Sequence, residues 1–577
     1  MNLPNSIAGE NFVLDTETTG LNIMVDTPLY LGWRLPGKHG TVRWSEGLVN
    51  WLNDHLPTAK VVVAHNAKFD CHMLIQGGVF PTVIDYTPVY CTMVGEQLCD
   101  EHRLSYSLDD LGHDLLNMRK SSSMYHVLAD KFGGKPDKSQ LKHLRHAPLE
   151  LIEKYVNQDT HICQCLFSRQ KDEIPKQGLG RISEIEQQVV KVLMRMERRG
   201  APIFKDRAEQ AIYAMRDAVD VADDDLWACV GYRTNPNSQP ALRLAFEMLG
   251  LPAMDSFDKD HLALVDHPVG QKILDYRQIL VTQNTFVEGL QEFIGRDGRI
   301  HCNFNQNKHE DGGTRTGRLS ATKPNLQQIP MRVETVAKVV RSLFGEKGRG
   351  WCAGDWSQFE YRIFAHFVGD ENVLAAYRNN PATDYHQALA DITGIPRNKA
   401  KRVNLGLVFS MGEGKLAKTL GLPCTEYVED GKTRYQPGPE AQLLFSQYHS
   451  KVPKTRPYLK ASTQEGEAKG FVRSLFGRKI RFPDRNKAYK AGGLRFQASA
   501  ADLMKQKLIE VDQALMCSGI GSELILVVHD EFDVLSPEGE EEKTCKLMKE
   551  IMEDIPDLQV PVLADVSHGH DWWEASS

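Results

Sequence analysis

The feature that most constrains the fold is a pair of short apolar runs separated by a long helical stretch. One run ends at Asp355 and the other at Val528, and both have the length and apolar content of strands. The residues between them have a predominantly helical pattern. The simplest arrangement is a sheet whose strands come from both sides of a long helical insertion. At 577 residues the chain is too long for one hydrophobic core, and we expect about three to five domains or subdomains.

Composition excludes several classes of protein. Apolar residues make up 41% of the chain and charged residues 25%, which is typical of a globular protein and not of a disordered or fibrous one. No apolar run reaches the roughly 18 residues of a membrane span, and residues 1–9 lack a signal-peptide pattern. The eleven scattered Cys indicate a reduced, cytoplasmic protein. The net charge of -7 argues only weakly against a nucleic-acid partner, because local patches decide binding.

The N-terminal part has an α/β pattern up to about residue 175. Residues 12–14 and 61–64 are predicted to be buried strands, and residues 151–166 a helix. A mostly helical region follows to about residue 300. Its first helix is predicted over 182–197, with a stop at Gly200.

Carboxylates gather at the ends of these predicted N-terminal elements. Asp15 and Glu17 directly follow the first strand, and residues two apart in a strand point to the same face. Asp70 comes after the second strand, while Tyr155 and Asp159 are four apart in the helix and share a face. Such a hard oxygen site suits Mg²⁺ or Mn²⁺, and two ions can drive displacement at phosphorus.

A lone Asp-x-Glu is most often a solvated pair or a helix cap, but here a complete set occurs in order. The set resembles the three motifs of proofreading 3′–5′ exonucleases, in the subclass with a tyrosine in the third motif. The resemblance covers about 160 residues. It implies that Asp15, Glu17, Asp70 and Asp159 are metal ligands and that Tyr155 positions the attacking water.

A second carboxylate pair stands far apart in the sequence. Asp355 ends one apolar run, and Asp530 lies 175 positions later between two runs that look like a hairpin. Each Asp alone is more often a turn residue than a ligand. If folding brings them together, they form a second two-metal site, suited to phosphoryl transfer to a 3′-hydroxyl.

A basic helix is predicted between these two carboxylates, after Pro396. Arg397, Lys401, Leu405 and Phe409 fall on one face, and a separate apolar face forms from Ala400, Val403, Leu407 and Met411. Two cations followed by two apolar side chains suit a nucleoside triphosphate. A solvated basic helix is an equally good interpretation of this segment alone.

Two further stretches favour contact with a nucleic-acid duplex. The segment 314–320 combines hydroxyls with guanidinium groups and is followed by 324–330. The segment 473–490 carries seven Lys or Arg against one acid, Asp484. Such patches bind phosphate backbones without reading sequence.

Taken together, these segments resemble the family-A DNA polymerases, which include the large fragment of bacterial DNA polymerase I and many phage replicases. Residues 355–360, 397–409 and 529–531 are similar to motifs A, B and C of that family. With the exonuclease motifs, the resemblance spans roughly residues 10–575. It implies an α/β and α+β multidomain fold: an RNase H-like 3′–5′ exonuclease domain over 1–175 and a right-hand polymerase over 176–577. The thumb would cover about 180–300, the palm about 300–365 and 490–577, and the fingers about 366–489.

The resemblance also implies residue roles and cofactors. Two Mg²⁺ ions are expected at each site, with Mn²⁺ as a substitute. The expected partners are primer-template DNA and dNTPs. At the polymerase site, Asp355 and Asp530 would hold the ions with help from Glu531, while Arg397 and Lys401 would bind the triphosphate, with Lys401 as the candidate proton donor to pyrophosphate. Glu360 would be the steric gate against a ribose 2′-hydroxyl. The remaining substrate-binding residues would be Arg318, Gln497 and His529, at the primer terminus or minor groove, together with Gln358, Leu405 and Phe409.

Four positions depart from the family pattern: Leu405 replaces Phe or Tyr, Phe409 replaces Tyr, Ser410 replaces Gly, and Gly493 stands where Asn is expected. Leu405 has no hydroxyl to replace a missing 3′-OH, so dideoxynucleotides should be poor substrates. Phe409 cannot hydrogen-bond Glu360, so we expect a less well anchored gate and weaker exclusion of ribonucleotides.

Three other segments resemble known sites only superficially. Residues 411–416 lack the spacing of a phosphate loop, and neither Cys163-Gln164-Cys165 nor His568-Gly569-His570 has zinc-site spacing. Trp572 and Trp573 are expected to anchor the C-terminus.

The rival functions are a 3′–5′ exonuclease with a silent polymerase site, a DNA-binding factor and a single-subunit RNA polymerase. The start of the first motif at Asp15 leaves no room for a 5′-nuclease domain, and the thumb looks ordinary in size. These features favour a phage-type replicative enzyme. We expect it to be a monomer in the cytoplasm of the host, and a helicase, a primase and other replisome proteins are further candidate partners.

Overall fold

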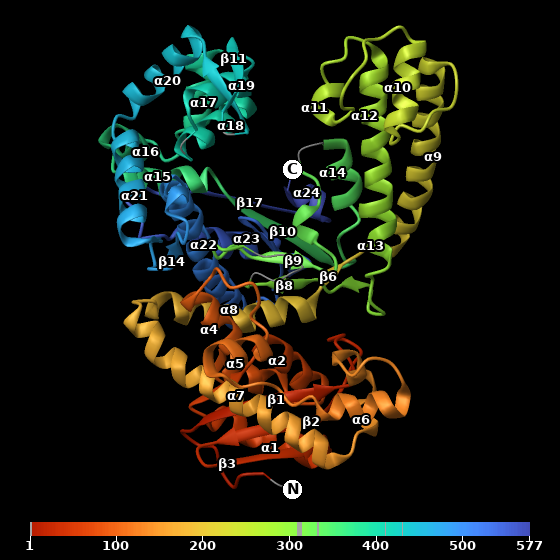
Figure 1. The fold of residues 1–577 in the computed structure, drawn as a ribbon, viewed down its shortest axis with the longest axis vertical. Helices are drawn as coiled ribbons and strands as arrows, with labels where there is room; N and C mark the ends of the chain where they lie inside the picture. Colours follow the sequence, from red (N-terminus) through yellow and green to blue (C-terminus); the bar gives the residue numbers. More distant parts are fainter. Residues whose placement is uncertain (1–2, 308–313, 332–333, 410, 430, 577) are drawn as a thin grey trace.

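The computed structural model describes residues 3–307, 314–331, 334–409, 411–429 and 431–576. Figure 1 shows an N-terminal lobe in red and orange below a central body that contains an antiparallel sheet. Two helical lobes, one yellow-green and one cyan, rise from this body on opposite sides. The helix α8 (Gly180–Arg199) lies between the N-terminal lobe and the body and packs against elements of both.

The N-terminal lobe is built on a mixed five-stranded sheet. Its strand order is β3 (Lys38–Arg43), β2 (Pro28–Leu35), β1 (Asn11–Thr18), β4 (Val61–Ala64) and β5 (Val89–Cys91). The pairs β1–β4 and β4–β5 are parallel, and the other pairs are antiparallel. Parallel neighbours need crossover connections, and here helices supply them, including α2 (Ala67–Gln76) directly after β4.

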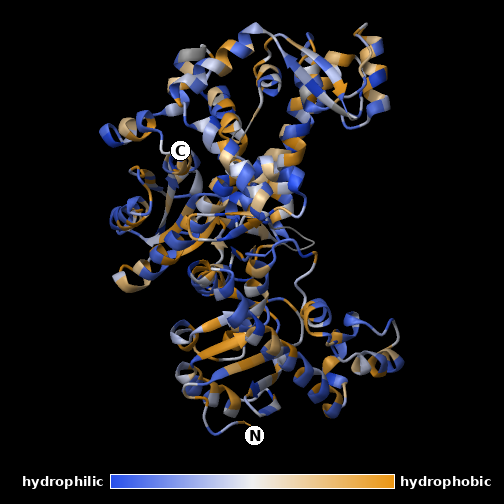
Figure 2. Cartoon of the chain, turned by 60° about the vertical axis from the view of Figure 1, so that its left-hand side comes forward, coloured by the Kyte–Doolittle hydropathy of each residue, from blue (hydrophilic) through white to orange (hydrophobic). Residues whose placement is uncertain are grey.

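The central strand β1 is buried on both faces, which explains its continuous apolar run. Phe12 and Leu14 belong to the core that also contains residues of α2 and α8. Val13 points to the opposite face, where the helix α7 (Leu149–Lys176) covers the sheet with Ile162 and Leu166. Figure 2 shows these inner strands as hydrophobic.

The sheet of the central body confirms the long-insertion arrangement. Its strand order is β15 (Glu523–Val528), β16 (Glu531–Pro537), β10 (Arg349–Trp356) and β17 (Ala564–Gly569), and every pair is antiparallel. The strands β15 and β16 form the expected hairpin, with His529 and Asp530 at its tip. The cover of this sheet includes α15 (Phe359–Val368), α22 (Ala491–Ser518), α23 (Glu541–Glu553) and α24 (Trp572–Ser576).

The two upper lobes each have their own small core. The yellow-green lobe contains α9 (Lys205–Val230), α10 (Gln239–Met248) and α12 (Pro268–Val281). The cyan lobe contains α17 (Tyr385–Thr393), α18 (Arg397–Val408), α19 (Glu413–Leu420), the hairpin of β11 (Cys424–Glu429) with β12 (Lys432–Pro437), and α20 (Pro439–Lys451). Within the described ranges, no helix combines the length and apolar content needed to cross a membrane.

The helices predicted from periodicity are present but longer. The helix predicted over 182–197 is α8, which ends before Gly200, whose φ of 65° suits only glycine well. The helix predicted over 151–166 is α7, which continues to Lys176 because its later turns pack on α4 (Thr92–Cys99) and α8.

Candidate functional sites

The structure brings the N-terminal carboxylates together. Asp15 and Glu17 point from the same face of β1, and Asp159 reaches them from α7. One ligand atom from each of these three side chains lies within 4.8 Å of the others. Asp70, in the first turn of α2, sits beside Asp15 and is held by Thr16, whose backbone N–H and Oγ1 donate to its Oδ1 at 3.0 and 2.8 Å.

Electrostatics favour the protonated form of these carboxyl groups unless cations lie close to them. Burial raises the pKa of Asp15, Glu17 and Asp70, and neighbouring carboxylates raise the latter two further. The pKa of Asp159 rises to about 7, again mainly through burial. Asp15 Oδ2 and Asp159 Oδ1 are buried and have no hydrogen-bond partner among the described residues. Orphaned hard oxygen atoms in a buried acidic cluster fit divalent cations such as Mg²⁺.

Two side chains complete this site. The Tyr155 hydroxyl accepts a hydrogen bond from the Tyr125 hydroxyl at 3.2 Å, and its pKa is raised by burial and by Glu17. Lys120 forms an ion pair with Asp159, and its ammonium lies 4.9 Å from the centre of the Tyr155 ring. Although burial favours the neutral amine, Asp159 and Asp15 raise the Lys120 pKa. Sequence reasoning missed Lys120 because no motif or spacing distinguishes it.

The second pair of carboxylates also meets in space. Asp355, near the end of β10, pairs in register with Glu531 of β16, which follows Asp530 at the hairpin tip. Burial raises the pKa of Asp355 to about 8, and the charges of Asp530 and Glu531 add to this, while Lys401 opposes it. Burial raises the pKa of Asp530 as well. Asp355 is exposed and Asp530 half-buried, so this acidic pair is open to solvent and, as a cluster of hard oxygen ligands, again fits divalent cations.

Glu531 is held by partners that the sequence did not reveal. Arg341 Nη1 donates to both of its carboxylate oxygens, at 3.0 and 3.3 Å, and the Trp572 indole N–H donates to Oε1 at 2.8 Å. Trp572 is fully buried and stacks on Trp351, so it does anchor the C-terminal helix α24 as expected. Its hydrogen bond also links that helix to the carboxylate site.

The basic helix α18 has the two faces that its sequence predicts. Ala400, Val403 and Leu407 are buried in the small core of their lobe. On the exposed side, the charge of Lys401 acts on Asp355, Asp530 and Glu360. Arg397 Nε donates to Asp384 Oδ2 at 2.6 Å, a contact with the first turn of α17 that sequence reasoning missed.

Comparison with known proteins identifies the family. The family model described as "DNA polymerase family A" matches residues 205–574. The chain belongs to DNA polymerase family A. It is 34% identical to "DNA polymerase DpoZ" of Acinetobacter phage SH-Ab 15497 over 100% of this chain and 99% of the relative. It is also 31% identical to "DNA polymerase I, thermostable" of Thermus aquaticus, over 68% of this chain and 48% of that one.

A solved structure shares the fold of this family A polymerase. It is described as "POL domain of Pol1 from M. smegmatis complex with DNA primer-template and dNTP". The TM-score is 0.80 at 24% sequence identity, and the match covers 99% of this chain and 97% of that chain. The likeness extends over the N-terminal lobe and over the region that the family model matches.

Departures from the family pattern contact one another in this polymerase. Gly493 lies on α22, and a Cβ at that position would stand only 2.3 Å from Cδ1 of the Phe409 ring. The ring therefore fills the space that a larger residue at position 493 would need. Ser410 lies outside the described residues. Leu405 is half-buried on the same helix.

The expected gate residue, Glu360, has a partner that the sequence did not reveal. Glu360 forms an ion pair with Arg318, so its carboxylate has an anchor even though Phe409 offers no hydroxyl. The Arg318 and Lys401 charges oppose the effect of burial, which raises the Glu360 pKa.

Gln358 has partners within the protein. Its Nε2 donates to the Thr383 carbonyl at 3.1 Å, and its Oε1 accepts from the Tyr385 backbone N–H at 3.1 Å. Its amide group therefore ties α15 to the start of α17, and its contact with substrate stays a prediction.

The basic segment 473–490 is only partly the open patch that we expected: its later cations, Arg485, Lys487 and Lys490, are exposed, while its earlier ones meet other parts of the protein. Arg478 is buried, Arg481 pairs with Glu101 of the N-terminal lobe, and Arg473 donates to the carbonyls of Gln177 and Gly178. These cations join parts of the protein to one another.

Proposed function

We propose that this chain extends a primer on a DNA template with dNTPs and removes mispaired ends with a separate 3′–5′ exonuclease site. The observation that carries the proposal is the presence of two carboxylate clusters with raised pKa values in two different lobes of one chain. Three relatives that match over nearly the whole chain are phage DNA polymerases, which favours a role in phage DNA replication. We propose that the enzyme acts as a monomer alongside other replisome proteins.

The proposed domains follow the lobes. Residues 1–175 would form the RNase H-like exonuclease domain and 176–577 the polymerase. The yellow-green lobe would be the thumb, the sheet of β10 and β15–β17 the palm, and the cyan lobe the fingers. This assignment places the carboxylates of the synthetic site on the palm and the basic helix α18 on the fingers.

At the synthetic site, Asp355 and Asp530 would hold two Mg²⁺ ions, with Mn²⁺ as a substitute. Such ions stabilise both oxygens of an in-line displacement at phosphorus. Arg397 and Lys401 would bind the triphosphate, and Lys401 would protonate the leaving pyrophosphate. Glu360 would lie against the sugar and exclude a 2′-hydroxyl.

Contacts to the DNA would come from the palm. Arg318, Gln497 and His529 are proposed to meet the primer terminus or the minor groove, and Leu405 and Phe409 the incoming nucleotide. His529 is exposed at the tip of the hairpin, and Gln497 is half-buried on α22.

At the exonuclease site, Asp15, Glu17, Asp70 and Asp159 would hold two further ions. The buried oxygens without partners on Asp15 and Asp159 support this ligand set. Tyr155 would orient the attacking water through its hydroxyl.

A single gel tests the proposal. A 5′-labelled primer on a longer template is incubated with the protein and Mg²⁺, with and without the four dNTPs. We expect lengthening with dNTPs and shortening without them. Shortening in both lanes would mean that the Asp355 and Asp530 site is silent, and a shifted complex with no change in either lane would leave only a DNA-binding role.

A further inference from the structure

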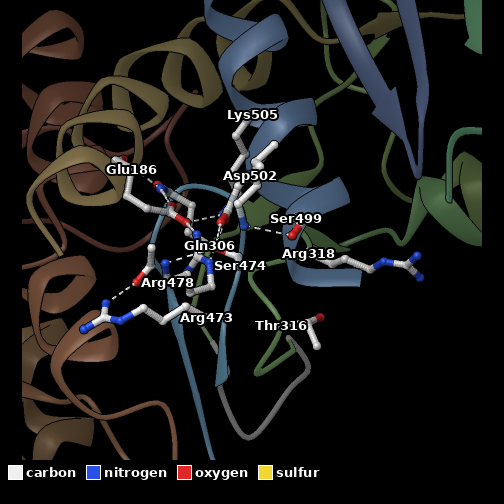
Figure 3. Close-up of polar contacts among 12 residues, drawn as sticks. Glu186, Gln306, Thr316, Arg318, Arg473, Ser474, Arg478, Ser499, Asp502 and Lys505 are labelled. Carbon is white, nitrogen blue, oxygen red and sulfur yellow. Dashed lines mark hydrogen bonds and ion pairs between the residues drawn. The ribbon is translucent and has the colours of Figure 1, made fainter. Parts of the chain in front are cut away.

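A buried charge network lies beneath the synthetic site, formed by Glu186, Arg478, Asp502 and Lys505. All four side chains are buried, and they come from α8, from the turn before β14 (Lys479–Arg481) and from α22. Arg478 Nε donates to Asp502 Oδ1 at 2.7 Å, and its Nη2 donates to Glu186. Lys505 Nζ donates to Glu186 Oε1 at 2.6 Å. The two acids balance the two bases, so the network is neutral overall (Figure 3).

The network is satisfied by uncharged groups as well. Gln306 Nε2 donates to Glu186 Oε2 at 2.6 Å, and the Ser474 hydroxyl donates to Asp502 Oδ2 at 2.6 Å. Although burial raises the pKa of Glu186, Lys505 and Arg478 lower it to about 2. A buried network with this many partners fixes the geometry of its members, and a change to one member disturbs the others.

One face of the Arg478 guanidinium lies against Gly317. A Cβ at Gly317 would stand 2.6 Å from Arg478 Cζ and 2.7 Å from its Nε. Gly317 also has a φ of 83°, which a residue with a side chain rarely adopts. The loop can therefore approach the guanidinium this closely only because position 317 is glycine.

The next residue along this loop reaches the synthetic site. Arg318 pairs with Glu360, and its charge counters the burial that raises the Asp530 pKa. Figure 3 shows Arg318 extending from the loop away from the charge network. The contact of Gly317 with Arg478 therefore holds the backbone next to Arg318. The ion pair with Glu360 holds the Arg318 guanidinium.

We propose that Arg478 is a positioning residue for nucleotide selection. Held by Glu186 and Asp502, it supports Gly317 and so fixes Arg318 where it can anchor Glu360. This inference rests on the proposed function, because it takes Glu360 as the group that excludes ribonucleotides.

The test measures the preference for dNTP over rNTP in single-nucleotide extension, as the ratio of kcat/KM values. The Arg478→Lys variant keeps the charge but loses the planar fork, and we expect it to lower the preference about tenfold. We expect Arg318→Ala to have a similar effect. Because both act through Glu360, the double variant should show little more loss than Arg318→Ala alone.

Two further variants keep the test decisive. Gly317→Ala keeps all four charges of the network but forces its new Cβ against the Arg478 guanidinium, and it should lower the preference in the same way. Arg481→Lys is the matched control, since Arg481 of β14 also pairs with a buried acid, Glu101, while the atoms nearest to a Cβ at Gly317 all belong to Arg478. It should lower Tm and leave the preference unchanged.

The proposal is overturned if Arg478→Lys and Gly317→Ala change only Tm, if their effects multiply with that of Arg318→Ala, or if the control lowers the preference equally. Failure of the proposed function is distinguishable, because the unaltered protein would then extend no primer at all.

Discussion

At the scale of single residues, cations set the behaviour of both carboxylate sites. Lys120 faces the N-terminal cluster, Lys401 faces Asp355, and Arg318 faces Glu360. Each cation opposes the effect of burial, which favours the protonated acid. The sites therefore depend on single positive charges that lie far from the carboxylates in sequence.

Lys120 gives a prediction for the exonuclease. Removing its charge in a Lys120→Met variant should raise the pKa of Asp15, Glu17 and Asp159, so these ligands ionise at higher pH. We expect the pH profile of degradation to move upward by about one unit, with about tenfold less activity at neutral pH. The measurement is the initial rate at which a single-stranded oligonucleotide is degraded, from about pH 6 to about pH 10.

Lys131→Met is the control, because Lys131 stacks on Phe132 and has no contact with the cluster in the described part of the chain. Extension rates should be unchanged in both variants. A pH profile of Lys120→Met that coincides with that of the unaltered protein would contradict the assigned role.

Leu405 gives a prediction for synthesis. A Leu405→Tyr variant supplies a hydroxyl that can replace the missing 3′-OH of a dideoxynucleotide, and one hydrogen bond corresponds to about a fivefold gain in its incorporation. Competition between ddNTP and dNTP on one primer measures the gain. Leu405→Phe adds the ring without the hydroxyl and should give no comparable gain; equal gains in both variants would assign the effect to packing.

At the scale of elements, contacts with the neighbouring helix α17 fix the position of the basic helix α18. His386 of α17 accepts a hydrogen bond from Asn404 of α18 at 3.2 Å through Nδ1, which requires a neutral ring. Burial lowers the His386 pKa to about 4; Asp384 opposes this, while Lys401 and Arg397 add to it. The neutral ring is thus part of the α17–α18 contact.

The sign of the pH effect follows from this lowered pKa. The unfolded chain binds a proton at His386 near its ordinary pKa of about 6.5, whereas the folded chain does not until about pH 4. Stability from the neutral ring is complete above pH 6.5 and is lost as the pH falls toward 4, by roughly 3 kcal/mol.

Hydrogen exchange of the α17 amides measures this effect. We expect protection to fall with pH across that window in the unaltered protein and to be nearly independent of pH in His386→Gln. The same pH dependence in both proteins would show that another group titrates.

The elements also show how far sequence alone could lead. The alternation of β1 and the four-residue spacing in α7 placed Asp15, Glu17, Tyr155 and Asp159 correctly, because these relations are local in the chain. Long-range partners left no local signal, as with Lys120 and with the hydrogen bond of Trp572 to Glu531.

The earlier cations of the basic segment 473–490 were misjudged for a related reason. A count of charges says nothing of the acids that meet them, and Glu101, Glu186 and Asp502 lie in other parts of the sequence. The partners of Gln358, on α17 and before it, likewise become visible only in the fold.

At the scale of the whole molecule, buried polar contacts join the N-terminal lobe to the rest. Glu197 of α8 accepts hydrogen bonds from His72 of α2 at 2.7 Å and from the Phe304 backbone N–H at 2.6 Å, and it forms an ion pair with Lys68. Lys68 and His72 flank Asp70 in α2. The helix that presents one carboxylate is therefore fixed to the body that carries the second site.

The central claim is that one chain holds two independent carboxylate sites with opposite effects on a primer end. The most direct measurement is the primer gel repeated with Asp355→Asn and Asp15→Asn. We predict that Asp355→Asn abolishes lengthening and leaves shortening, while Asp15→Asn abolishes shortening and leaves lengthening. Loss of both activities in either variant, with Tm unchanged, would contradict the claim of two separate sites.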